Sequence, residues 1–210
     1  MNAPSIAPAA EQALERTFER AMAAAGRALG EMSGHEIHVV ATEVAWTSSA
    51  QVVEAAGGAG TIVVGIYLGI TGSLTGHSVL VLQPEGAHRL AGLLLEGFAE
   101  IARTDDAETP SFDDLELSAL QEVGNVTVAA FLNEVGKHLD EPVSPTVPVA
   151  ITDMAGAILD AILADLTMEH DEVLAARTSF INGGDTIEGA VLVLPQEESL
   201  QRLLKALGAE

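Results

Sequence analysis

Apolar residues recur at intervals of three and four positions in several stretches of the chain, which is the period of an amphipathic helix. The clearest stretch covers residues 11–32, where Leu14, Phe18 and Leu29 fall on one face. The same period predicts helices over residues 84–102, 113–138, 153–166 and 195–207, and a short helix or loop over residues 48–56.

Two of these helices carry signals at their starts. Ser111 precedes the helix at 113–138, and Asp114 follows three residues later, which is the spacing of an N-cap and a first-turn acid. Asp153 is the candidate cap of the helix at 153–166. Residues 104–110 are polar and predict a linker.

Shorter apolar runs, bounded by turn residues, predict strands. They cover residues 35–46, 61–70, 77–83, 142–151, 172–181 and 189–194. Pro145 and Pro148 place the fourth run on a sheet edge or in an irregular segment, because proline cannot donate a hydrogen bond to a strand ladder.

The expected elements repeat once along the chain, which indicates an internal duplication. Residues 11–103 and 112–208 are the expected repeats of one domain spanning residues 1–210. Placing Glu122 over Glu19 aligns the two repeats with an offset of 103 residues. One repeat has too few strands to bury both faces of a sheet. We therefore predict an α/β fold, an α+β sandwich with pseudo-two-fold symmetry and long helices packed on a mainly antiparallel sheet.

Composition narrows the function classes. The chain has 210 residues, of which 48% are apolar, and a formal net charge of −22. Nucleic acid is not expected as a partner because phosphate binding needs Lys and Arg, and anionic membranes are disfavoured for the same reason. The acidity suits either solubility or a preference for basic partner surfaces. Without cysteine, disulfides and thiolate chemistry are excluded, and the scattered histidines predict no metal site.

The start of the chain lacks the basic and apolar pattern of a signal peptide. The longest apolar run, residues 61–70, is too short to span a bilayer. We therefore expect a soluble, cytoplasmic protein.

A polar stripe interrupts the helix at 113–138. Ser118, Glu122 and Asn125 are four and three residues apart, which puts them on one side of the helix. The core side is expected at Leu117, Leu120, Gly124, Val128, Phe131 and Val135. Such spacing is also common on solvated helix faces, but asparagine is unfavourable inside a helix, which favours a functional reason for Asn125.

The stripe resembles the motif of the CheC family of chemotaxis phosphatases, whose relatives are CheX and the flagellar-switch phosphatases. The family motif is Asp or Ser, three residues, Glu, two residues, Asn, twenty-two residues and Pro. Here it is met by Ser118, Glu122, Asn125 and Pro148. The duplicated layout is also similar, and the likeness extends from about residue 11 to 208.

This resemblance implies a hydrolase that removes phosphate from the phospho-aspartate of a CheY-like response regulator. It implies that Asn125 orients the attacking water, that Glu122 pairs with a lysine of the regulator, and that Ser118 borders the contact. Pro148 is expected to shape the strand near the helix. The regulator is expected to supply Mg²⁺, so the chain needs no cofactor of its own.

The helix that follows the motif indicates a second candidate partner. This helix, with Asp153, Met154 and Asp160, resembles the helix that follows the motif in CheC proteins. In relatives it lies near the surface that binds CheD, the receptor-modifying deamidase, so CheD is a candidate partner.

The first repeat departs from the motif. At the offset of 103 residues its corresponding positions are Glu15, Glu19, Met22 and Ala45. Because a methionine cannot replace the hydrogen bonds of an asparagine, one active helix is expected. The alternatives are a non-catalytic scaffold of the same fold, akin to the middle domain of FliM, and an adaptor that sequesters the phosphorylated regulator.

Overall fold

The computed structural model describes residues 8–95, 111–165 and 172–208 of the chain. Its helices are α1 (Pro8–Ser33), α2 (Ser49–Ala55), α3 (Pro84–Leu95), α4 (Asp114–Leu139), α5 (Ala155–Asp165) and α6 (Glu197–Ala206). Its strands are β1 (Ile37–Ser48), β2 (Ile62–Gly72), β3 (Gly76–Leu82), β4 (Val143–Pro145), β5 (Val149–Met154), β6 (Glu172–Asn182) and β7 (Asp185–Pro195). The predicted order of elements is confirmed, while the predicted linker at 104–110 lies outside the described residues. Within these residues, no helix is both long and apolar enough to cross a membrane.

The strands form an antiparallel sheet in the order β1-β6-β7-β3-β2-β4, with β5 also paired to β2. β1 belongs to the first repeat but pairs with β6 of the second, and β5 of the second repeat pairs with β2 of the first. Each repeat therefore contributes the edge strand of the other. The long run predicted at 142–151 is divided into β4 and β5, and it lies on the edge as its prolines indicate.

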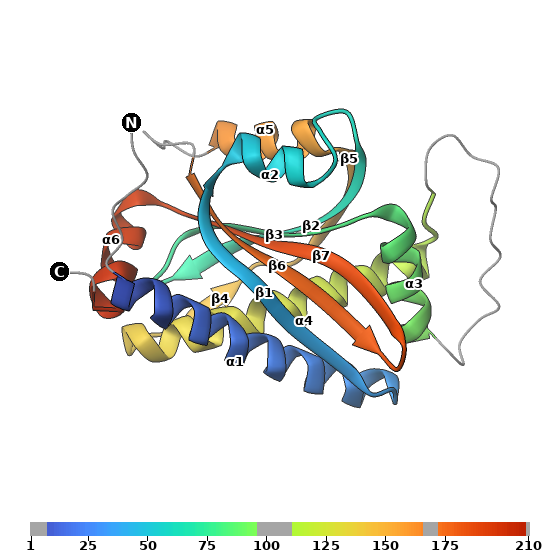
Figure 1. The fold of residues 1–210 in the computed structure, drawn as a ribbon, viewed down its shortest axis with the longest axis horizontal. Helices are drawn as coiled ribbons and strands as arrows, with labels where there is room; N and C mark the ends of the chain where they lie inside the picture. Colours follow the sequence, from blue (N-terminus) through green and yellow to red (C-terminus); the bar gives the residue numbers. More distant parts are fainter. Residues whose placement is uncertain (1–7, 96–110, 166–171, 209–210) are drawn as a thin grey trace.

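Helices cover both faces of the sheet (Figure 1). α1 and α4 lie side by side along one face, where their apolar sides enclose a core with Ile66, Leu80 and Val193 of the strands. α2 and α5 lie over the other face, where Ile158 of α5 packs in a second cluster with Val79. The expected α+β sandwich, with long helices on an antiparallel sheet, is confirmed.

A constant spacing relates the two long helices. α1 and α4 are each 26 residues long, and they begin and end 106 residues apart. Every buried residue of α1 has a buried counterpart in α4 at this spacing. Gly30 and Gly136 also repeat one close approach, since a Cβ on either would lie 2.9 Å from a carbonyl oxygen, of His35 and Glu141 respectively. The offset of 103 residues expected from the sequence is therefore wrong, by nearly one helical turn.

Candidate functional site

The polar stripe lies on the outer side of α4. Ser118 and Glu122 are exposed, and Asn125 is half-buried. The residues predicted to face the core are buried, except Leu117, which is half-buried. The helix therefore presents a hydroxyl, a carboxylate and a carboxamide along about two turns of a rigid element.

The side chains of Ser118 and Glu122 are exposed to solvent, and that of Asn125 is partly exposed. Within the described residues, no hydrogen bond or ion pair engages the side chain of Ser118, Glu122 or Asn125. The described part of the chain also contains no group of three His, Asp or Glu side chains that could hold a metal ion. The carboxylate and the carboxamide are thus placed where the surface of another molecule can reach them.

The start of α4 is fixed by a capping box. The Asp113 carboxylate accepts hydrogen bonds from the N–H groups of Leu115, at 2.9 Å, and Glu116, at 2.8 Å. The Glu116 carboxylate accepts from the Asp113 N–H at 3.0 Å and lies 2.9 Å from Nδ1 of His88 on α3. The prediction that Ser111 is the N-cap is therefore wrong, because Asp113 and Glu116 complete the reciprocal pair instead.

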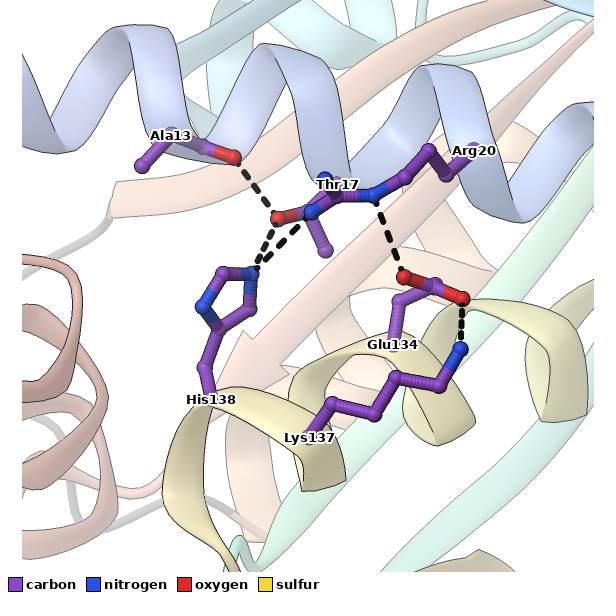
Figure 2. Close-up of polar contacts among 6 residues, drawn as sticks. All are labelled: Ala13, Thr17, Arg20, Glu134, Lys137 and His138. Carbon is purple, nitrogen blue, oxygen red and sulfur yellow. Dashed lines mark hydrogen bonds and ion pairs between the residues drawn. The ribbon is translucent and has the colours of Figure 1, made fainter.

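The far end of α4 is tied to α1 by ion pairs (Figure 2). Glu134 on α4 lies 3.2 Å from Nε of Arg20 on α1 and also pairs with Lys137 on its own helix. The hydrogen bond from Lys137 and the charges of both cations hold the pKa of Glu134 below its usual 4.5. The carboxylate therefore stays charged between the two helices.

A hydrogen-bonded pair joins the helices beside these ions (Figure 2). Thr17 Oγ1 donates to the carbonyl oxygen of Ala13 at 2.7 Å and lies 2.9 Å from Nε2 of His138. Nε2 of His138 also lies 3.4 Å from Nη2 of Arg20, so this ring nitrogen contacts both the Thr17 hydroxyl and a guanidinium N–H. Burial holds the pKa of His138 below its ordinary 6.5, and the charge of Arg20 lowers that pKa further. Contacts at both ends thus hold α4 in place, with the polar stripe between them.

Both the sequence and the fold are similar to those of known proteins. No protein-family model matches the sequence. The chain is 27% identical over 162 residues to the CheY-P phosphatase CheC of Bacillus subtilis (strain 168), covering 76% of this chain and 75% of that protein. The resemblance to the CheC family is confirmed.

Several solved structures share the fold. FliY of Thermotoga maritima is 16% identical, with a TM-score of 0.75 over 97% of this chain and 98% of that chain. The FliM middle domain of H. pylori is 10% identical, with a TM-score of 0.70 over 96% and 99%. CheX of Borrelia burgdorferi, solved in a complex with CheY, BeF3 and Mg²⁺, is 18% identical, with a TM-score of 0.52 over 87% and 97%.

The first repeat carries a different set of residues where the second carries the CheC-family motif. At the spacing of 106 residues, the counterparts of the stripe are Gln12, Arg16 and Glu19, all of them exposed. Met22, which the sequence matched to Asn125, is fully buried in the core, so that match is wrong. Arg16 reverses a charge and Glu19 replaces a carboxamide, so α1 lacks the glutamate and asparagine pair of the CheC family.

Pro148, the last residue of the CheC-family motif, lies in a bulge at the sheet edge. Between β4 and β5, residues 146–148 face only Leu68 and Gly69 of β2. β1 has an extra residue at the equivalent place, Thr42, which lies 106 residues before Pro148. A proline fits here because the ladder is interrupted and its missing N–H is not required. A role for Pro148 in shaping the strand stays a prediction.

The residues expected in a CheD-binding helix lie on two elements. Asp153 and Met154 belong to β5, where Asp153 is paired with Val63, while Asp160 lies on α5; all three are exposed. The prediction that Asp153 caps the helix is wrong, because α5 begins only at Ala155 and the Asp153 carboxylate accepts from the Met154 N–H at 2.7 Å. Binding of CheD stays a prediction.

Sequence reasoning missed the contacts that fix the far end of α4. His138 stood among scattered histidines, and its partner lies more than a hundred residues away, at Thr17. The available signal was Thr17 itself, which follows Leu14 by three positions on the apolar side of the first helix. A hydroxyl at such a position needs a hydrogen-bond partner.

Proposed function

We propose that this protein is a phosphatase that hydrolyses the phospho-aspartate of a CheY-like response regulator, with Asn125 as its catalytic residue. The observation that carries the proposal is an exposed Glu122 and a partly exposed Asn125 on one side of a helix fixed at both ends. The similarity to a protein named CheY-P phosphatase supports the proposed substrate.

The proposed reaction requires few catalytic groups from the phosphatase. In an acyl phosphate the aspartyl carboxylate is already a good leaving group. A water attacks the phosphorus, the bond from phosphorus to the aspartyl oxygen breaks, and inorganic phosphate and a free carboxylate result. Phosphoryl transfer is accelerated mainly by alignment and charge stabilisation. The Asn125 carboxamide can accept a hydrogen bond from the water and donate another, which holds the water in line.

Glu122 is proposed to fix the docking. It lies almost one turn before Asn125, and its exposed carboxylate can pair with a lysine of the regulator. Ser118 lies one further turn away and borders the contact. The regulator supplies Mg²⁺ in this proposal, and the complex of CheX with CheY, BeF3 and Mg²⁺ supports such an assembly.

The test measures loss of phosphate from a purified phosphorylated CheY-like regulator in the presence of this protein at a small fraction of its concentration. Repeated turnover, with decay well above the regulator's own rate, is the expected result. Decay at the regulator's own rate contradicts the proposal. Stoichiometric slowing of decay indicates an adaptor that sequesters the phosphorylated regulator.

The second candidate function is a scaffold, favoured by the similarity of the fold to the FliM middle domain. A scaffold does not require a carboxylate and a carboxamide in this arrangement on an exposed helix side, so the pair favours the enzyme. A scaffold would bind flagellar-switch components without changing the rate of phosphate loss.

CheD remains a proposed further partner. The side of β5 and α5 that carries Met154 and Asp160 is exposed, with Met154 at 45% exposure. Calorimetric titration of the protein with CheD tests this directly. If the parent protein gives no binding heat with CheD at micromolar concentrations, CheD is removed from the proposal. If it does give heat, Met154→Ser and Asp160→Ala are the variants to compare with it.

A further inference from the structure

Gly124 lies between the two proposed functional residues and rests directly on the sheet. A Cβ added there would lie 2.3 Å from Cγ2 of Ile66 and 2.9 Å from its Cβ. Carbon atoms in contact are normally about 3.5–4.0 Å apart. Ile66 is fully buried in β2, and its β-branched side chain has little freedom to rotate away. Only glycine therefore lets α4 approach β2 this closely.

The first repeat carries a large residue on the helix and a small one on the strand at the equivalent positions. The counterpart of Gly124 in α1 is Phe18, at the spacing of 106 residues. The counterpart of Ile66 in β6 is Ala176, because β2 and β6 begin and end 110 residues apart. Bulk is on the strand beneath α4 but on the helix in α1. Phe18 stacks on Phe131 of α4, with ring centroids 4.3 Å apart.

We propose that Gly124 is a positioning residue for the pair of Glu122 and Asn125. It sets the height of α4 above the sheet, and thereby fixes how far the two side chains that flank it project toward a docked partner. This inference rests on the proposed phosphatase function. A shift of about 1 Å in a catalytic group is enough to cost roughly a hundredfold in rate, and an added methyl group at Gly124 would force a movement of that order.

The test compares Gly124→Ala with the double variant Gly124→Ala/Ile66→Ala. In the single variant the methyl group pushes α4 off β2, so kcat falls roughly ten- to a hundredfold while KM for the phosphorylated regulator changes less than about threefold. In the double variant the Cγ2 atom at 2.3 Å is removed and only the Ile66 Cβ at 2.9 Å remains, so α4 needs to move much less. Its kcat returns to within about threefold of the parent.

Two control variants distinguish an effect on the position of α4 from an effect on the stability of the protein. Ile66→Ala alone leaves a cavity and lowers Tm, but α4 can still approach β2, so kcat is retained. Val128→Ala removes buried atoms one turn further along α4 and is likewise expected to lower Tm with kcat unchanged. If kcat falls in all these variants in proportion to lost stability, or the double variant is no better than Gly124→Ala, Gly124 has only a packing role and the proposal is overturned.

A second readout does not depend on activity. The side-chain amide of Asn125 is identified in an NMR spectrum by its loss in Asn125→Ala. Gly124→Ala is expected to move this signal, and the added Ile66→Ala is expected to move it back. If the parent protein has no phosphatase activity, the proposed function fails, but the amide signal still decides the inference: an unmoved signal in Gly124→Ala contradicts it.

Discussion

Asn125 on α4 and Glu19 on α1 hold equivalent positions in the two repeats, 106 residues apart. Both lie on the outer side of their helix, yet one carries a carboxamide and the other a carboxylate. The position of Glu122 is matched by Arg16, which reverses the charge. The two outer helix sides are therefore alike in geometry and different in chemistry, and only α4 is suited to the proposed reaction.

Replacing either residue of the α1 pair should be nearly silent. Glu19→Ala and Arg16→Ala remove exposed side chains that belong to α1 and not to the proposed site on α4. Phosphatase rates within about twofold of the parent, and stability within about 0.5 kcal/mol, are expected. A rate loss as large as that of an α4 variant would show that the first repeat is also active.

Glu122→Gln keeps the size of the side chain and removes its charge. If Glu122 pairs with a lysine of the regulator, KM should rise about tenfold, because a hydrogen bond between charged groups is lost. The dependence of KM on salt concentration should weaken at the same time. Glu15→Gln, an exposed glutamate on α1, serves as the control and should leave KM unchanged. Equal KM and salt dependence in both variants would remove Glu122 from the docking contact.

His138 should make stability depend on pH. Burial holds its pKa below 6.5 in the folded protein, so the unfolded chain takes up a proton at a higher pH. The contribution of His138 to stability is fully present above pH 6.5 and is lost as the pH falls through the lowered folded value. Glu134 titrates below 4.5, in a separate window. Urea unfolding at several pH values should show a smaller loss for His138→Gln than for the parent, and identical pH dependence would contradict the assignment.

Two buried threonines should respond to valine in opposite directions. Thr127 on α4 is fully buried, and within the described chain its hydroxyl has no hydrogen-bond partner. Thr127→Val should therefore raise the free energy of unfolding by about 1 kcal/mol. Thr17→Val should lower it by a similar amount, because it removes the hydroxyl that donates to the Ala13 carbonyl oxygen and contacts Nε2 of His138. Thermal unfolding of both variants gives the comparison, and a destabilised Thr127→Val would indicate that its hydroxyl is satisfied in solution.

Most of the fold could be predicted because each element has a local signal. Apolar positions at the helical period located the helices, and short apolar runs bounded by turn residues located the strands. Pro145 and Pro148 placed their strand at the sheet edge. The spacing of the repeats could not be obtained this way. Offsets of 103 and 106 differ by three residues, nearly one turn, so both keep the apolar sides of α1 and α4 in phase. Burial of Met22 decides between them.

The candidate site likewise has a part that local sequence signals predict and a part that depends on contacts between distant segments. The stripe of Ser118, Glu122 and Asn125 depends on spacing within one helix. The exposure of Ser118 and Glu122 could be predicted from periodicity, whereas Asn125 is half-buried. The packing of Gly124 on Ile66 joins segments far apart in the chain. A glycine inside a helix is unfavourable and indicates close packing at Gly124, but no pattern in either segment identifies Ile66 as its neighbour.

The decay of phosphorylated regulator with Asn125→Ala tests the central claim most directly. Asn133→Ala is the matched control, since Asn133 is an exposed asparagine on the same helix. The account predicts that Asn125→Ala lowers the catalysed rate at least about a hundredfold, to the regulator's own decay, without loss of stability. Asn133→Ala should keep the parental rate. Parental phosphatase activity in folded Asn125→Ala would contradict the account.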